Sequence, residues 1–140
     1  MNAAEIIRHH EGLRLRPYLC TSKKLTIGYG RNLEDRGLTR QEADYLLEND
    51  LHDIRRQLVE RIDCWDQLSE VRQAVLIDMA YNLGLAGLLK FKNTLAAVSA
   101  GRYKTAACEM LDSRWAKQVG ARANRLAAMM ATNRWPKDFK

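Results

Sequence analysis

The chain has 140 residues, 46% of them hydrophobic, which is enough for one compact domain with a substantial apolar core. Its 23 basic and 17 acidic residues give a net charge of +6, which favours a polyanionic partner: nucleic acid, an anionic membrane surface or a bacterial cell wall. The first residues hold no apolar run long enough for a signal peptide or a membrane anchor, and no repeat or flexible linker predicts a second independent domain.

A short amphipathic helix is predicted to begin the chain and to end at Gly12. Asn2 is a favourable N-cap, and Glu5 lies at the spacing that completes a capping box. Glu11 is then the last carboxylate before the glycine that stops the helix. The negative end of the helix dipole disfavours ionised Glu11 and favours a proton on it, which suits a general acid.

Two strands are predicted next, because the apolar period changes to two. Residues 13–20 alternate between apolar and polar side chains and predict a strand with one buried face, and residues 25–30 predict a second strand. The turn-like residues 21–24 join them in a hairpin, which brings Cys20 near Thr26 on the polar face. The glycines in the second strand have no side chains, so a bulky ligand could lie across that face. The hairpin therefore suits the floor of a cleft.

A polar link, residues 31–37, leaves room for a short third strand before the first long helix. Thr39 and Glu42 have the spacing of a second capping box, so this helix is expected to begin there. Apolar residues recur behind it at helical spacing with charged residues between them, and no breaker appears before about Ile62. The prediction is one long, half-exposed helix.

The remainder of the chain is predicted to be helical. Ser69 caps a helix that is apolar nearly all round, the pattern of a buried central helix, and Gly84 and Gly87 punctuate its end. Further helices are predicted at residues 92–100, 103–111 and 121–133, and either a turn or a short helix at 113–120.

No metal site is predicted. His9, His10 and His52 lack a consistent ligand spacing with the three cysteines of the chain. Cys64 and Cys108 are expected to be half-buried free thiols, which fits synthesis in a reducing compartment. We expect no cofactor.

The N-terminal segment resembles the phage-type lysozymes of glycoside hydrolase family 24. Glu11, Cys20 and Thr26 have the spacing of that family's catalytic residues. The stretches that match the family are residues 11–15, 26–30, 38–43, 80–84, 113–115 and the arginine-bearing final helix. Many members have aspartate where this chain has Cys20, although cysteine is an accepted variant of the pattern.

The resemblance implies an α+β, lysozyme-like fold in a single domain, residues 1–140. A small N-terminal lobe, about residues 12–60, holds a short antiparallel β-sheet in such a fold. The long helix joins it to a mainly helical C-terminal lobe, about residues 61–140, on which the first helix packs. The chain is expected to be a monomer.

The resemblance also implies an endolysin, a muramidase that hydrolyses the β-1,4 bond between N-acetylmuramic acid and N-acetylglucosamine in peptidoglycan. Glu11 is the expected general acid, and Thr26 is expected to hold the attacking water. The role of Cys20 is left open: it is a weak base, a thiolate that stabilises the sugar cation, or a polar spacer. A role as a covalent nucleophile ranks below water activation.

Four further residues are candidates for contacts with the glycan strand: Tyr29, Asn82, Trp115 and Arg122. Tyr29 either contacts sugar at the cleft mouth or fills the small lobe. Trp115 either lines the far wall together with Asn82 or closes the core. The resemblance implies that Arg122 pairs with Glu11 and fixes its position, whereas the residues alone also allow a solvated basic helix face.

The expected partners are the glycan strands of peptidoglycan, and no nucleic acid. The resemblance implies a phage or prophage origin and residence in the host cytoplasm until a holin, without direct contact, allows release to the cell wall in the periplasm. Three alternatives stay open: a related transglycosylase that makes an anhydro-sugar, an inactive lysozyme fold that binds the wall, and a basic helical nucleic-acid-binding domain, which the charge alone supports.

Overall fold

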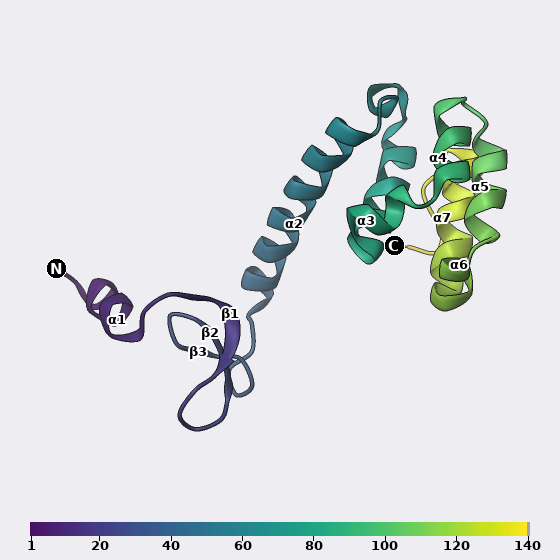
Figure 1. Ribbon diagram of the computed structural model, residues 1–140. Coiled ribbons are helices and arrows are strands. Elements are labelled where there is room, and N and C mark those ends of the chain that lie inside the picture. Colours follow the sequence, from purple (N-terminus) through teal and green to yellow (C-terminus); the bar gives the residue numbers. More distant parts are fainter. Residues whose placement is uncertain (140) are drawn as a thin grey trace. The chain divides into compact units, whose positions relative to one another are not determined.

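The computed structural model of the chain describes residues 1–139. Within them, three strands form one antiparallel sheet near the N-terminus, and helices make up most of the rest (Figure 1). The chain divides into two compact units, Met1–Leu47 and Glu48–Lys140. This is the α+β class that the sequence predicts.

Helix α1 covers Ala3–Glu11 and begins and ends as the sequence predicts. Asn2 Oδ1 accepts a hydrogen bond from the Glu5 amide at 3.0 Å, and Glu5 Oε2 accepts one from the Asn2 amide at 2.8 Å. Gly12 ends the helix with φ of 69°, a value that glycine adopts without a steric penalty. Glu11 is therefore the last helical residue.

The sheet contains β1 (Arg14–Leu19), β2 (Leu25–Gly28) and β3 (Arg31–Asn32), hydrogen-bonded in that order. In the register, Thr26 of β2 faces Tyr18 of β1 on one side and Asn32 of β3 on the other. The short third strand lies inside the polar link, where the sequence leaves room for it. Thr26 is thus in the central strand of the sheet.

The buried face predicted for β1 is wrong. Leu15 is 79% exposed and Leu19 is 64% exposed. Alternation decides which side chains share a face of a strand, but it does not supply the side chains that cover this face. Among the described residues of the first unit, Thr26 alone is buried, at 3% exposed.

Helix α2 covers Arg40–Arg61 and confirms the long helix. Thr39 Oγ1 accepts from the Glu42 amide at 3.1 Å, and Glu42 Oε1 accepts from the Thr39 amide at 2.9 Å, which is the predicted capping box. The guanidinium of Arg31 in β3 donates to both oxygens of the same carboxylate. This ion pair ties the start of α2 to the end of the sheet.

The second unit holds the apolar core. Its elements are the 3₁₀ turn Trp65–Gln67, α3 (Glu70–Leu89), α4 (Lys92–Ser99), α5 (Tyr103–Leu111), α6 (Arg114–Val119) and α7 (Ala121–Thr132). The helices confirm the predicted segments, and the 3₁₀ turn was not predicted. The fully buried residues of the core include Leu58, Leu76, Met110 and Met130.

Within residues 1–139, no single helix is long and apolar enough to cross a membrane, although α3 and α4 together, bent by 100°, reach that length and composition.

Helix α3 is interrupted, not ended, at Gly84. Ser69 caps its start, where Oγ accepts from the Arg72 amide at 3.2 Å. Gly84 has φ of 78° and ψ of 160°, which is not helical, and the helix then continues to Leu89. The sequence predicts an end where the structure has a kink, because glycine permits this conformation without preventing the helix from resuming.

The cysteines are free, and one of them is placed differently from the prediction. Cys64 is half-buried as expected, whereas Cys108 is exposed. On α5 the buried positions are Ala106, Ala107 and Met110. Cys108 therefore falls on the side of the helix that faces away from the core.

Candidate functional site

Cys20 and Thr26 meet at one backbone carbonyl group. The Cys20 amide donates to the Lys24 carbonyl oxygen at 3.0 Å, and the Thr26 hydroxyl donates to the same oxygen at 2.8 Å. The Lys23 amide closes the intervening turn by donating to the Cys20 carbonyl at 2.8 Å. The turn between β1 and β2 therefore holds both residues in a fixed relation, as the hairpin interpretation expects.

The direction of the Thr26 hydrogen bond determines what this side chain can do. A carbonyl has no proton to give, so the Thr26 hydroxyl must donate to Lys24. The hydroxyl oxygen then keeps its lone pairs and can accept a hydrogen bond from a water molecule. A water that donates to Thr26 keeps its own lone pair free to attack an electrophilic atom. A residue that holds the attacking water in hydrolysis must leave that lone pair free.

Hydrogen bonding lowers the pKa of the half-exposed Cys20 thiol. The Lys24 backbone amide contributes most, burial opposes the shift, and the Ser22 backbone amide and the Thr26 hydroxyl act in the same direction as Lys24. Thr26 has a single hydroxyl proton, which the Lys24 carbonyl takes, so the two amides are the main cause. Cys20 is therefore more often a thiolate at neutral pH than an ordinary cysteine.

The Glu11 carboxylate lies against Gly30, in the turn between β2 and β3. A β-carbon placed on Gly30 would come within 2.5 Å of Glu11 Oε2, so any other residue here would make the carboxylate shift from this position. In the preceding turn of α1, the Arg8 guanidinium lies 5.7 Å from the centre of the Tyr29 ring, and Tyr29 is 43% exposed. The last turn of α1 thus contacts the turn that follows β2.

The three candidate catalytic residues are consequently arranged along β2. The turn that carries Cys20 precedes this strand, Thr26 is in it, and Glu11 lies against the turn that follows it. Such an arrangement offers a carboxyl group beyond one end of the strand and a hydroxyl with a thiol at the other. It is chemically suited to general acid catalysis with water activation on a chain laid across the sheet.

Asn82 and Trp115 form a hydrogen-bonded pair in the second unit. Trp115 Nε1 donates to Asn82 Oδ1 at 2.8 Å. Trp115 is 4% exposed, and its ring meets the Phe91 ring edge-on at a centroid distance of 5.8 Å, so the indole belongs to the core. The exposed Asn82 keeps its NH₂ group free of the indole and can reach a sugar hydroxyl.

Arg122 of α7 pairs with Asp78 of α3, with Nε 2.8 Å from Oδ1. Sequence reasoning did not single out Asp78, although an acidic residue in an otherwise apolar helix is a usable signal. The predicted pairing of Arg122 with Glu11 joins residues of different units and stays a prediction.

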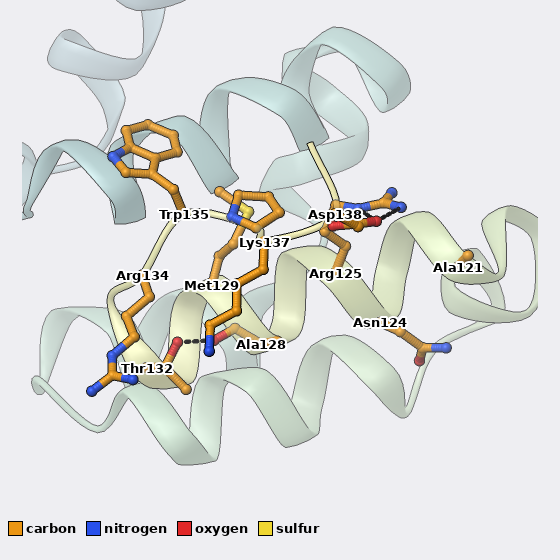
Figure 2. A pocket seen from close by; sticks show the side chains of 11 residues that line it. Ala121, Asn124, Arg125, Ala128, Met129, Thr132, Arg134, Trp135, Lys137 and Asp138 are labelled. Atoms are coloured by element: carbon orange, nitrogen blue, oxygen red, sulfur yellow. Dashed lines mark hydrogen bonds and ion pairs between the residues drawn. The ribbon is translucent and has the colours of Figure 1, made fainter. Parts of the chain in front are cut away.

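A pocket of about 590 Å³ lies between α7 and the C-terminal segment and contains none of these residues (Figure 2). Arg125 Nη2 lies 2.7 Å from Asp138 Oδ2 on one side, and Trp135, 53% exposed, lines another. The other lining residues include Ala128 and Met129. Asp138, the one carboxylate among the lining residues, is paired with Arg125, so the size of the pocket does not by itself mark a reactive site.

A family model described as phage lysozyme matches residues 8–133, a span that includes Glu11, Cys20 and Thr26. The chain is 26% identical over 116 residues to the endolysin of Acyrthosiphon pisum secondary endosymbiont phage 1, covering 80% of this chain and 75% of that protein.

Two other relatives differ in how much of their length is matched. Probable T4-type lysozyme 1 of Dictyostelium discoideum is 24% identical over 157 residues, covering 91% of this chain and 92% of that protein. The pre-baseplate central spike protein Gp5 of Enterobacteria phage T4 is 29% identical over 160 residues, covering 94% of this chain. The chain spans only 28% of the length of the spike protein, so the similarity concerns one part of it.

Proposed function

Since the chain belongs to the phage lysozyme family, a family of glycoside hydrolases, we propose that it is an endolysin that cleaves the β-1,4 bond between N-acetylmuramic acid and N-acetylglucosamine in peptidoglycan. The match over residues 8–133 is the observation that carries this proposal. The relative named endolysin supports it, and so does the arrangement of carboxyl, hydroxyl and thiol groups along β2.

In this proposal Glu11 is the general acid. Its carboxyl proton passes to the glycosidic oxygen as the bond between that oxygen and the anomeric carbon breaks. Charge develops on the sugar as an oxocarbenium-like cation, and the carboxylate that remains lies against Gly30. Because Gly30 has no side chain, the Glu11 carboxylate can occupy the space that a β-carbon would take.

A water molecule held by Thr26 then bonds to the anomeric carbon. The water donates one hydrogen bond to Thr26 Oγ1, because the hydroxyl proton is already committed to the Lys24 carbonyl. Its departing proton goes to the Cys20 thiolate, whose lowered pKa favours the charged form before the reaction. Solvent exchange later returns this proton and reprotonates Glu11.

The remaining candidate residues are assigned to the glycan strand and to Glu11. Tyr29, which follows β2 and lies beside Arg8, is assigned to sugar contact at the cleft mouth, and Asn82 is assigned to bind sugar hydroxyl or acetamido groups through its NH₂ group. Arg122 is assigned to positioning Glu11. The net charge of +6 favours approach to an anionic wall, and we propose a monomer that stays in the host cytoplasm until a holin allows it to reach the periplasm.

The test is the clearing of purified, outer-membrane-free peptidoglycan by the unmodified protein, Glu11→Gln and Cys20→Asp, with mass analysis of the products. We expect clearing with new reducing ends from the unmodified protein and a loss of about a hundredfold or more in Glu11→Gln, because that side chain keeps its shape but has no acidic proton. We expect Cys20→Asp to retain activity, because a carboxylate supplies the same charge.

Other outcomes identify the alternatives. Products with an anhydro-sugar would indicate a transglycosylase. Activity that appears only in Cys20→Asp would mean that the site is inactive with a thiol at position 20 and that the natural protein only binds the wall. Folded proteins that all fail to clear peptidoglycan would contradict the proposed function.

A further inference from the structure

The Lys24–Leu25 peptide group connects the candidate site to the loop that follows β3. Its carbonyl oxygen accepts from the Cys20 amide and from the Thr26 hydroxyl, at 3.0 Å and 2.8 Å. Its N–H, which belongs to Leu25, donates to Glu34 Oε1 at 2.9 Å. A peptide group is planar and rigid, so whatever fixes the N–H also fixes the direction of the carbonyl.

Glu34 replaces a backbone acceptor that the sheet does not provide. The Leu33 amide donates to the Leu25 carbonyl at 2.8 Å, as a continuing β2–β3 ladder requires. The reciprocal bond, from the Leu25 amide to the Leu33 carbonyl, is not made; the Leu33 carbonyl accepts from the Gly37 amide at 3.0 Å, and the Leu25 amide donates to Glu34. The chain turns away after β3, and the Glu34 carboxylate takes the vacant place.

We propose that Glu34 is a positioning residue that orients the Lys24 carbonyl and, through it, the Thr26 hydroxyl and Cys20. The inference rests on the proposed function, and it adds a residue from the β3–α2 loop to catalytic candidates that come from α1 and the hairpin.

The charge of Glu34 also acts through the peptide group. An ionised acceptor polarises the N–H it binds, and hydrogen bonds in series strengthen one another. The Lys24 carbonyl oxygen becomes a better acceptor for the Thr26 proton. The Thr26 lone pairs then stay directed toward the water.

Asp35 provides a matched control, because it is the next residue and also carries an exposed carboxylate. Its Oδ1 lies 3.3 Å from Lys24 Nζ, and its Oδ2 accepts from Asn32 Nδ2 at 3.0 Å. Its side chain contacts other side chains and not the β2 backbone. Asp35→Ala removes a charge from the same loop without touching the Lys24–Leu25 peptide group.

The experiment compares the unmodified protein, Glu34→Ala, Glu34→Gln and Asp35→Ala in peptidoglycan clearing, with thermal unfolding of each. In Glu34→Ala we expect kcat to fall about tenfold or more with KM within about twofold, because the residue orients groups and does not contact the glycan. Glu34→Gln keeps an oxygen that can accept from Leu25 and should retain most of the activity. Asp35→Ala should stay within about twofold of the unmodified protein.

A second readout does not depend on lytic activity. The rate of Cys20 alkylation by iodoacetamide is measured against pH, with the Cys20 peptide identified by mass spectrometry. The midpoint should rise in folded Glu34→Ala, where the Lys24–Leu25 peptide group loses one of the bonds that orient it beside Cys20, and should not change in Asp35→Ala. This measurement separates failure of the positioning role from failure of the proposed function.

Three results would overturn the proposal. The first is unmodified kcat and an unmodified alkylation midpoint in Glu34→Ala. The second is an equal loss in Glu34→Ala and Asp35→Ala, which would show a general effect of loop charge. The third is a failure of Glu34→Gln to restore activity while its fold is intact.

Discussion

At the scale of single residues, the missing side chain at Gly30 leaves the space that the carboxylate of the candidate acid occupies. In Gly30→Ala a β-carbon would lie within 2.5 Å of Glu11 Oε2, and the carboxylate must move away. We expect peptidoglycan clearing to fall by about a hundredfold, since a displacement of about 1 Å at a reacting group has that effect. The measurement is the initial clearing rate of the folded variant.

Gly101→Ala is the control for backbone strain. Gly101 has φ of 71°, close to the 75° of Gly30, and a β-carbon there meets nothing within 4 Å. Both variants should lose about 1–2 kcal/mol in the free energy of unfolding, because a side chain is disfavoured in this conformation. Only Gly30→Ala should lose activity; equal activities in the two variants would show that Gly30 does not position Glu11.

The sequence indicates Glu11, Cys20 and Thr26 through their spacing, but it does not reveal how they are held. The shared acceptor is the backbone carbonyl of Lys24, and a backbone group leaves no trace in residue identity. Glu34 is equally hidden, because its partner depends on where the chain turns after β3. The sequence thus allows the candidate residues to be named, whereas their main-chain partners are visible only in the structure.

At the scale of elements, the β1–β2 turn contains a strained residue. Lys23 has φ of 61°, the left-handed conformation that glycine adopts freely, at the bulge position of a three-residue hairpin loop. We expect Lys23→Gly to raise the free energy of unfolding by about 0.5–1 kcal/mol, because relief of strain exceeds the added chain entropy of glycine. Urea unfolding measures the change.

The neighbouring position tests the sign of this prediction. Lys24 is not left-handed, so Lys24→Gly gains chain entropy in the unfolded state without any relief of strain and should lose about 0.5–1 kcal/mol. If both glycine variants shift stability in the same direction, the strain assigned to Lys23 is wrong.

The ion pair between β3 and α2 predicts acid sensitivity. Hydrogen bonding from Arg31, followed by that from the Thr39 amide, lowers the pKa of the Glu42 carboxyl from 4.5 to about 2. The unfolded state therefore binds the proton first as the pH falls, so the contribution of Glu42 is complete above pH 4.5 and disappears toward pH 2. The stability difference between the unmodified protein and Glu42→Gln should shrink over this interval; parallel curves would contradict the assignment.

The helices were more predictable than the environment of the strands. Capping pairs such as Asn2 with Glu5 and Thr39 with Glu42 are local, so sequence spacing locates them. The exposed face of β1 could not be predicted, because burial depends on what covers a strand and not on its own alternation. The 3₁₀ turn Trp65–Gln67 is too short to produce a period.

At the scale of the whole molecule, the buried apolar residues extend from Leu58 to Met130, all in the second unit. Since apolar burial dominates stability, the sheet should open at a lower free energy than the core helices. Leu76→Ala, at a fully buried site, should cost about 2–5 kcal/mol. In native-state hydrogen exchange, this substitution should raise the exchange rates of amides in α3, α5 and α7 and leave those in β1–β3 unchanged.

A surface substitution such as Lys117→Ala serves as the reference, since Lys117 is exposed on α6. This substitution should not appreciably change the exchange rates of the amides in the helices or in the sheet. Equal acceleration of the sheet and the helices by Leu76→Ala would show that the described residues unfold as a single cooperative unit.

The peptide group between Lys24 and Leu25 has a consequence for tolerance to mutation. Each contact that it makes with the candidate site and with Glu34 uses, on its own side, its main-chain N–H or carbonyl, so exchanging the Lys24 or Leu25 side chain leaves that donor and acceptor in place. A scan of all substitutions should therefore find many residues permitted at 24 and 25. Intolerance should appear at Thr26 and Glu34, whose side chains bond this peptide group. At position 25, proline should be the substitution rejected, because it removes the N–H.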